Sequence, residues 1–146
     1  MKQKYIEAFM DMAERFGQTS EAQRLKVGAL LVKDNRVISL GVNGQPSGWG
    51  TEVCEGQDGQ TLPTVIHSEK ACLDKLRRST ESAVGSQMFV SHSPCLACSI
   101  EIFDSGVRAV YYRYDYRSAD GIKYLLDKGV PVYKIPQGGL QHDTTV

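Results

Sequence analysis

Four side chains, at two places in the sequence, have the chemistry to bind and use a metal ion. His67 and Glu69 stand two residues apart, and Cys95 and Cys98 form a Cys-x-x-Cys pair directly after Pro94. Zinc accepts imidazole nitrogen and thiolate sulfur in a tetrahedral shell, and catalytic zinc sites use three protein ligands and keep the fourth position for water. We therefore predict that His67, Cys95 and Cys98 bind one catalytic Zn²⁺ per chain.

Glu69 has a different predicted role, because it stands too close to His67 along the chain to join the same ligand shell easily. It would still lie near the open position, where its carboxylate can take a proton from water and deliver it elsewhere. We predict that Glu69 is the catalytic acid and base. The alternative is a redox pair, or a buried cysteine pair with an unrelated histidine, and it leaves both Glu69 and Pro94 unexplained.

Apolar spacing predicts the elements that position these residues. We expect helices over residues 1–16, 67–78, 94–105 and 119–128, and strands over residues 27–32, 37–42, 88–91, 109–112 and 132–135. The first two strands form a hairpin, and strands joined by helical crossovers are expected to run parallel. The predicted fold class is α/β, a three-layer α/β/α sandwich on a five-stranded mixed sheet.

The predicted helix starts explain how the ligands can meet. His67 begins one helix, and Cys95 and Cys98 lie in the first turn of the next, on one face. The unpaired N–H groups and positive dipole end of a helix start stabilise thiolates. Pro94 suits the first helical position. Apolar stripes are expected at Leu96, Ile100 and Phe103 of this helix and at Ile122, Leu125 and Leu126 of the last helix.

The composition is that of a globular protein. The 146 residues are 41% hydrophobic and 23% charged, and they predict one domain over residues 1–146, of which 137–146 form a polar C-terminal tail. Seventeen basic residues balance seventeen acidic ones, which argues against a nucleic-acid partner. No apolar run approaches the roughly 20 residues of a membrane span, and no signal peptide is evident. We expect a cytoplasmic protein with no membrane partner.

The two halves of the metal motif together are typical of zinc-dependent nucleobase deaminases. The chain resembles the deoxycytidylate (dCMP) deaminases of the cytidine deaminase superfamily from about Tyr5 to Pro136, so the fold should be cytidine deaminase-like. The resemblance is carried by His67-Ser68-Glu69, Pro94-Cys95-Leu96-Ala97-Cys98, residues 27–29, residues 41–48, Val110-Tyr111-Tyr112 and Tyr116-Arg117. Ser68 stands where the family usually has Ala, Val42 replaces an aromatic residue, and Ser47 replaces a frequent Arg.

This resemblance implies hydrolysis of dCMP to dUMP and ammonia, which feeds thymidylate synthesis. Glu69 would move a proton from water to ring nitrogen 3 and then to the departing amine. The family also implies a homo-oligomer, and many of its members are hexamers. The resemblance further implies that dCTP activates the enzyme and dTTP inhibits it, with Mg²⁺ bound to the triphosphate. The implied effector-binding residues are Asn43, Gly44, Gln45, Pro46, Ser47 and Gly48.

The resemblance and the residue types suggest four substrate-binding side chains. Asn43 would reach toward the sugar, and Ser93 stands beside the pocket. Arg24 is a candidate for the 5′-phosphate, since guanidinium binds phosphate with two hydrogen bonds, and Tyr116 for stacking on the pyrimidine. The alternatives are an ordinary solvated charge for Arg24 and a surface tyrosine near a subunit contact for Tyr116.

Three other functions compete with this one. The same fold could deaminate another cytosine nucleoside or nucleotide, or a base in tRNA or single-stranded DNA, which would require a basic channel. A non-catalytic zinc module is the third, and it has no use for Glu69. Oligomerisation is also suggested by the aromatic residues Tyr111, Tyr112 and Tyr114, because alternate residues of a strand face opposite sides and one of the three should leave the core.

Overall fold

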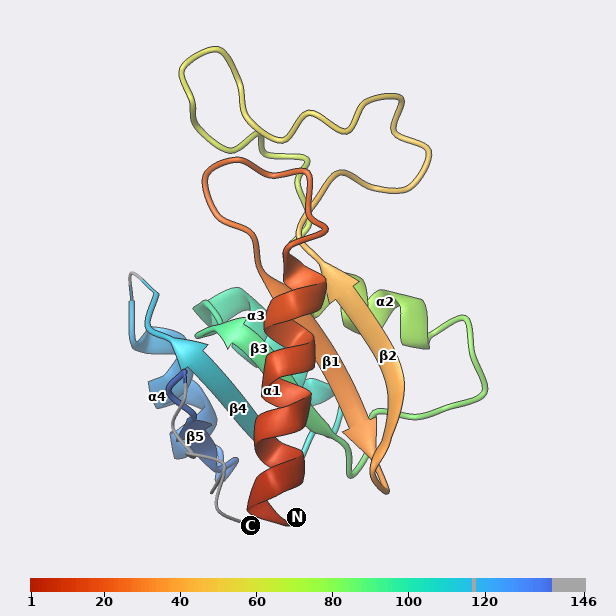
Figure 1. Cartoon of the computed structure of the whole chain (residues 1–146), viewed down its shortest axis with the longest axis vertical. Helices are drawn as coiled ribbons and strands as arrows, with labels where there is room; N and C mark the ends of the chain where they lie inside the picture. The colour runs from red at the N-terminus through yellow and green to blue at the C-terminus, as the bar shows by residue number, and fades with distance from the viewer. Residues whose placement is uncertain (117, 138–146) are drawn as a thin grey trace, which may run out of the picture.

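Helices cover both faces of one five-stranded sheet in the computed structural model, which describes residues 1–116 and 118–137 (Figure 1). The helices are α1 (Gln3–Gly17), α2 (Ser68–Leu76), α3 (Leu96–Asp104) and α4 (Asp120–Asp127). The strands are β1 (Gly28–Lys33), β2 (Arg36–Val42), β3 (Gln87–His92), β4 (Ala109–Tyr114) and β5 (Val132–Lys134). The predicted element order is confirmed, with small shifts at the element ends.

The sheet is mixed, and its strand order is β2-β1-β3-β4-β5. β1 pairs antiparallel with both β2 and β3, whereas β3, β4 and β5 pair in parallel. The β1–β2 hairpin turns at Asp34 and Asn35, whose φ angles of 52° and 58° are the left-handed values that a two-residue type I′ turn requires. The two helical crossovers α3 and α4 join parallel neighbours, as the sequence predicts.

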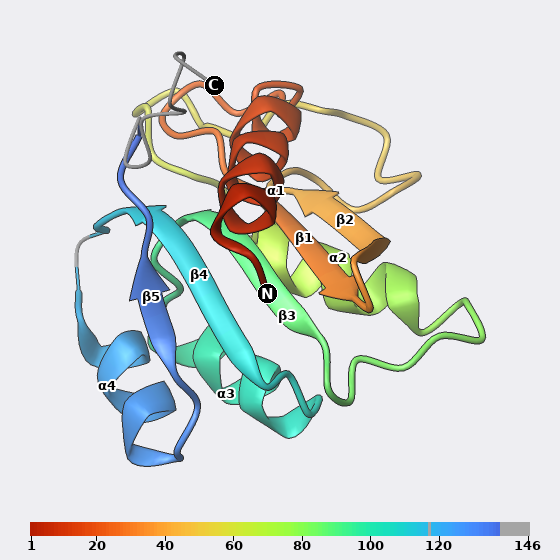
Figure 2. The same ribbon diagram turned by 60° about the horizontal axis from the view of Figure 1, so that its bottom comes forward.

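Helix α1 covers one face of the sheet, and α2, α3 and α4 cover the other (Figure 2). One apolar cluster on each face joins these three layers. Alternate residues of β3 supply both clusters, since Phe89 packs under α1 while Met88 and Val90 face α2, α3 and α4. Tyr111 and Tyr112 divide in the same way. Both are buried, at 7% and 8% exposure, whereas Tyr114 is half-buried, so Tyr114 is the one of the three predicted tyrosines that partly leaves the core.

The predicted apolar stripes of α3 and α4 are partly wrong. Leu96 and Ile100 are 45% and 38% exposed, and Leu126 is 53% exposed. The inward face of α3 is instead set by Cys98 and Ile102, four residues apart, because Cys98 must turn toward His67. Pro94 also lies before the N-cap residue Cys95 and not at the first helical position.

A segment without helix or strand, residues 43–66, connects β2 to α2. Its base is closed by a bridge between Gly44 and Ile66, and a second bridge pairs Glu55 with Thr61. The segment leaves the same end of the sheet as the loop that joins α1 to β1 (Figure 1). The two loops therefore stand together where β2 ends.

Arg117 and residues 138–146 lie outside the described residues, as does nearly all of the predicted polar tail over 137–146. Among the helices that the structure describes, none has the length and apolarity needed to cross a membrane.

Candidate active site

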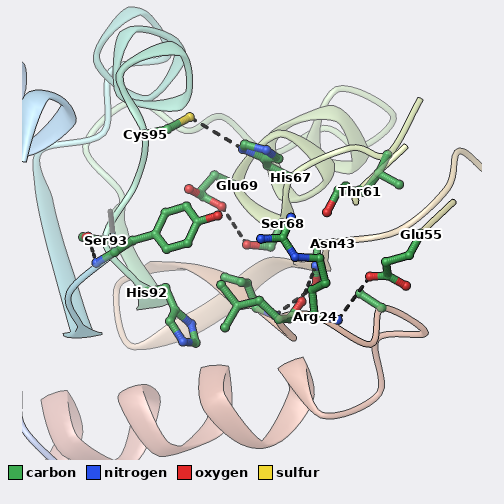
Figure 3. A pocket seen from close by; sticks show the side chains of 15 residues that line it. Arg24, Asn43, Glu55, Thr61, His67, Ser68, Glu69, His92, Ser93 and Cys95 are labelled. Atoms are coloured by element: carbon green, nitrogen blue, oxygen red, sulfur yellow. Dashed lines mark hydrogen bonds between the residues drawn. The ribbon is translucent and has the colours of Figure 1, made fainter. Parts of the chain in front are cut away.

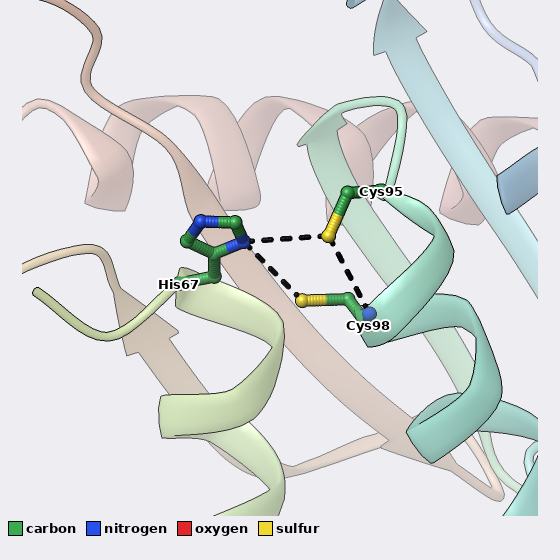
Figure 4. Close-up of side chains that lie close together, drawn as sticks. All are labelled: His67, Cys95 and Cys98. Atoms are coloured by element: carbon green, nitrogen blue, oxygen red, sulfur yellow. Dashed lines mark hydrogen bonds between the residues drawn. The ribbon is translucent and has the colours of Figure 1, made fainter. Parts of the chain in front are cut away.

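Two helix starts bring the three predicted metal ligands together (Figure 4). His67 is the N-cap residue of α2, Cys95 is the N-cap residue of α3, and Cys98 lies in the first turn of α3. The Nδ1 atom of His67 lies 3.6 Å from the Sγ atom of Cys95 and 3.4 Å from the Sγ atom of Cys98. The metal-ligating atoms of these three residues all lie within 4.8 Å of one another. Among the described residues, they form the group of three or more His, Cys, Asp or Glu side chains that is compact enough to hold a metal ion.

These separations fit a zinc ion. Tetrahedral zinc with Zn–S of about 2.3 Å and Zn–N of about 2.0 Å sets sulfur and nitrogen ligands about 3.5 Å apart, and both measured sulfur–nitrogen distances agree with this. One imidazole and two thiolates leave one of four positions open, which is the ligand set of a catalytic site. The side chains therefore need little movement to bind the metal.

The thiols are prepared for metal binding. Hydrogen bonds from Cys98 and His67 lower the pKa of Cys95 to about 4. The backbone N–H of Cys98 also donates to the Cys95 sulfur, at 3.5 Å, as expected at a helix start. The pKa of Cys98 is raised by its hydrogen bond to Cys95 and by burial, and the contact with Cys95 raises the pKa of His67. The lowered pKa of Cys95 favours its thiolate, which is the form that binds a metal. The raised pKa values of Cys98 and His67 favour their protonated forms, and a bound cation would displace those protons.

Glu69, the second residue of α2, is buried beside this group. Burial raises the pKa of its carboxyl group, and the hydroxyl of Ser68, which donates to Oε1 at 2.7 Å, acts in the opposite direction. Glu69 lines the same cavity as His67 and Cys95, as the sequence predicts (Figure 3). A buried carboxyl group with a raised pKa can both accept and donate a proton near neutral pH.

Two glycines to which the sequence analysis gave no packing role allow the ligand-bearing helix starts to pack closely. A Cβ atom on Gly41 of β2 would lie 2.6 Å from the carbonyl oxygen of Ser68, and one on Gly121 of α4 would lie 2.2 Å from the carbonyl oxygen of Pro94. Only residues without a side chain allow these backbones to pack so closely. A lone glycine inside an apolar strand was the available signal for Gly41.

The cavity beside the metal group has a volume of about 240 Å³. All four predicted substrate residues line it: Arg24, Asn43, Ser93 and Tyr116. His92 lines it too, and so do Glu55 and Thr61 of the 43–66 segment, which the sequence analysis missed. Figure 3 shows His67, Glu69 and Cys95 toward one end of this cavity and Arg24 and Glu55 toward the other.

Comparison with known proteins identifies the type of site. Residues 3–114 match the family described as the cytidine and deoxycytidylate deaminase zinc-binding region. The chain belongs to this family. The crystal structure of the dCMP deaminase from the cyanophage S-TIM5, in complex with dCMP and dUMP, is 48% identical and covers 92% of this chain and 98% of its own, with a TM-score of 0.90.

One further relative agrees with this assignment, and one further structure shares the fold. The deoxycytidylate deaminase of Mycobacterium phage D29 is 34% identical over an alignment of 119 residues, which covers 73% of this chain and 91% of the phage protein. A diaminohydroxyphosphoribosylaminopyrimidine deaminase/reductase from Thermotoga maritima shares the fold at 21% identity, with a TM-score of 0.70 over 96% of this chain and 38% of its own. The predicted family resemblance and fold class are confirmed.

Two of the substrate candidates of this deaminase use their polar side chains to shape the cavity wall. The Asn43 side chain accepts the N–H of Val27 at 2.9 Å and donates to the carbonyl oxygen of Leu25 at 2.7 Å. The hydroxyl of Ser93 accepts the N–H of Tyr116 at 2.8 Å. Asn43 therefore holds the chain that enters β1, and Ser93 holds the segment that carries Tyr116.

The six predicted effector residues line a second hollow of about 700 Å³, with Trp49 and the carboxylates of Glu21 and Glu52 at its wall. Gly48 and Gly50 adopt φ angles of 76° and 93°, which only glycine takes readily. No lysine or arginine of the described chain lines this hollow. Asn43 lines both cavities, so it lies at the boundary between them, as predicted.

Proposed function

We propose that this member of the deaminase family hydrolyses dCMP to dUMP and ammonia. The observation that carries the proposal is the His-Cys-Cys group next to the buried Glu69, in a cavity with Arg24 at its far end. The 48% identity to a dCMP deaminase solved with dCMP and dUMP supports the substrate. The product dUMP is the nucleotide that a methylation to dTMP consumes.

Glu69 performs the proton transfers in the proposed reaction. When bound by His67, Cys95 and Cys98, Zn²⁺ supplies Lewis-acid chemistry that brings the pKa of a water molecule toward neutrality. Glu69 takes a proton from that water and delivers it to ring nitrogen 3 of cytosine as the water oxygen bonds to carbon 4. It then takes the second proton, from the new hydroxyl group on carbon 4, and gives it to the amine as the bond between carbon 4 and the amine nitrogen breaks. The hydrogen bond from Ser68 sets the orientation of the carboxylate during these steps.

The rest of the cavity binds the nucleotide. Arg24 contacts the 5′-phosphate, Tyr116 stacks on the pyrimidine, and Asn43 reaches the sugar. Arg24 is well suited because it is exposed at the cavity, and guanidinium forms strong charge-assisted hydrogen bonds with phosphate.

Regulation is proposed through the second hollow, where dCTP would activate and dTTP would inhibit. Glu21 and Glu52 line this hollow, so Mg²⁺ would be needed to offset the charge of a triphosphate beside their carboxylates. A ligand that orders residues 43–48 can move Asn43 and thereby the substrate cavity. Effector action requires a different affinity for active and inactive states.

A homo-oligomer, with the hexamer as the proposed form, would cover apolar side chains that one chain leaves exposed on α3, namely Leu96 and Ile100. The one-domain organisation over residues 1–146 is likewise a proposal, and the cytoplasmic location stays a prediction. Light scattering that gives a mass near the chain mass of 16.1 kDa would contradict the assembly.

Turnover and metal content test the catalytic proposal together. Initial rates should be highest with dCMP when cytidine, deoxycytidine and dCMP are compared. Cys98→Ala should lower the zinc content below one ion per chain, whereas Glu69→Gln should keep zinc and lose turnover. Faster turnover of deoxycytidine than of dCMP would contradict the substrate. For regulation, a dCMP rate curve that neither dCTP nor dTTP changes would exclude the effector site.

A further inference from the structure

The carboxylate of Glu55 holds the backbone of the loop that carries Arg24. Its two oxygens accept the N–H of Gln23 at 3.2 and 3.0 Å, and Oε2 also accepts the N–H of Arg24 at 3.2 Å. Figure 3 shows Glu55 and Arg24 side by side at the end of the cavity away from Glu69. Two neighbouring backbone donors on one carboxylate fix both the position and the direction of this loop.

Glu55 is itself built into a small hairpin of the 43–66 segment. The N–H of Leu62 donates to the carbonyl of Cys54 at 2.8 Å, the N–H of Gly56 donates to the carbonyl of Gln60 at 2.9 Å, and Glu55 faces Thr61 between them. The side chain of Cys54 is buried and anchors the start of the hairpin. The carboxylate is therefore presented from a defined backbone, although its segment contains no helix or strand.

The rest of the loop before β1 is held at other points. Ser20 donates to the carbonyl oxygen of Asn43 at 2.7 Å, and the Asn43 side chain binds the backbone of Leu25 and Val27. Gln23 and Arg24 lie between these two attachments and are exposed. Their backbone N–H groups have Glu55 as partner.

The same hairpin also touches the Arg24 side chain. Its Nη1 atom donates to the Oε1 atom of Gln60 at 3.2 Å. Glu55 thus fixes the Arg24 backbone while Gln60 contacts the guanidinium. Without the backbone attachment, substrate binding would have to order the loop backbone as well as the Arg24 side chain, at a cost in conformational entropy.

We infer that Glu55 is a positioning residue for substrate binding, which keeps the Arg24 guanidinium at the cavity by fixing the backbone of Gln23 and Arg24. This inference rests on the proposed binding of the dCMP phosphate by Arg24. It assigns a role to the 43–66 segment at the substrate cavity in addition to its lining of the second hollow.

Steady-state kinetics of four proteins test the inference: wild type, Glu55→Ala, Arg24→Ala and the double variant. Hydrogen bonds to a charged group are worth enough to expect a rise of about tenfold in the KM for dCMP in Glu55→Ala. The kcat should stay within about twofold, because Glu69 and the metal group are untouched. Glu55→Gln keeps one acceptor oxygen, so its KM should rise less.

The double variant separates positioning from an independent contact. If Glu55 acts through Arg24, its removal adds nothing once the guanidinium is gone, and the double variant should have the KM of Arg24→Ala. Glu81→Gln, at an exposed ion pair with Arg36, is the matched control and should behave as wild type. Additive KM effects, or a fall in kcat at unchanged KM, would overturn the inference.

Amide hydrogen exchange gives a readout that is independent of turnover. The N–H groups of Gln23 and Arg24 should exchange faster in Glu55→Ala, while those of β1 keep their protection. Unchanged exchange at both residues would overturn the positioning role even if dCMP is the substrate. A wild type that prefers deoxycytidine, or an Arg24→Ala variant with an unchanged KM for dCMP, would show that Arg24 does not bind the phosphate. The substrate role of Glu55 then fails as well, even if Glu55→Ala speeds amide exchange.

Discussion

Substitution of Gly121 by alanine should weaken zinc binding from a position that makes no contact with the metal. Gly121 is the second residue of α4, and its backbone packs on the loop that carries Cys95. A Cβ atom there would lie 2.2 Å from the carbonyl oxygen of Pro94, 2.5 Å from the Oγ atom of Ser99 and 2.8 Å from the carbonyl carbon of Cys95. Two of these three neighbours are backbone atoms, so a side-chain rotation cannot relieve the overlap.

The size of the effect follows from these distances. Carbon atoms in contact prefer about 3.5–4.0 Å, so α4 and the Pro94–Cys95 backbone must separate by about 1 Å. Overpacking of this kind costs about 1–3 kcal/mol, and the higher helix propensity of alanine returns up to about 1 kcal/mol. Because the overlap with backbone atoms is severe, we take the upper end of this cost and expect a net loss of about 2 kcal/mol in the free energy of unfolding. Zinc affinity should fall about 10- to 100-fold, as for other residues that orient metal ligands.

Two measurements check this prediction. Denaturant unfolding of the metal-free protein gives the stability change, and competition with a chromophoric chelator gives the zinc affinity. Lys123→Ala, at an exposed position of the same helix, is the control. Gly121→Ala with the zinc affinity of the control would refute the idea that α4 positions Cys95, and unchanged stability would refute the close packing itself.

Three further predictions concern the site and the core. Glu69→Gln should lower kcat about 10²- to 10⁴-fold. Burial raises the pKa of Glu69 above its ordinary value of 4.5, so above that pH the folded metal-free wild type binds more protons than the unfolded chain. The stability of the wild type should therefore fall as pH rises through the raised pKa, and unfolding curves of the variant should lack this fall. Arg113→Met should lower the free energy of unfolding in urea by about 2–3 kcal/mol, since the buried guanidinium binds the α1 carboxylates of Asp11 and Glu14 at 2.9 and 3.0 Å. Those carboxylates are 64% and 22% exposed and can rehydrate, which keeps the loss below the ~3–5 kcal/mol of a fully buried pair. A loss under about 0.5 kcal/mol would contradict this. Removal of zinc with a chelator should make Cys95 reactive toward iodoacetamide, because its pKa is lowered to about 4. Burial raises the pKa of Cys72 to about 12, so Cys72 should stay unmodified until the protein unfolds. Mass spectrometry of the alkylated chain checks both expectations.

The sequence by itself determined the chemistry of the site and the order of the elements. A histidine, a glutamate and a Cys-x-x-Cys pair define a metal donor set with an acid–base group, whatever surrounds them. Apolar periodicity is a local property, so helices and strands could be read from short windows. Helix starts at His67 and Cys95 followed from the same local signals, and the structure confirms them within one or two residues.

Only the tertiary structure decided which surfaces meet. The spacing of Leu96, Ile100 and Leu126 suggested burial, but the direction of each helix is set by Cys98 and by the neighbouring layer, and these three side chains face outward. Gly121 and Glu55 act on backbone atoms 26 to 32 residues away in the chain. Local sequence patterns carry no information on contacts between such distant segments, because these contacts exist only after the sheet has ordered its strands and brought the loops to one end.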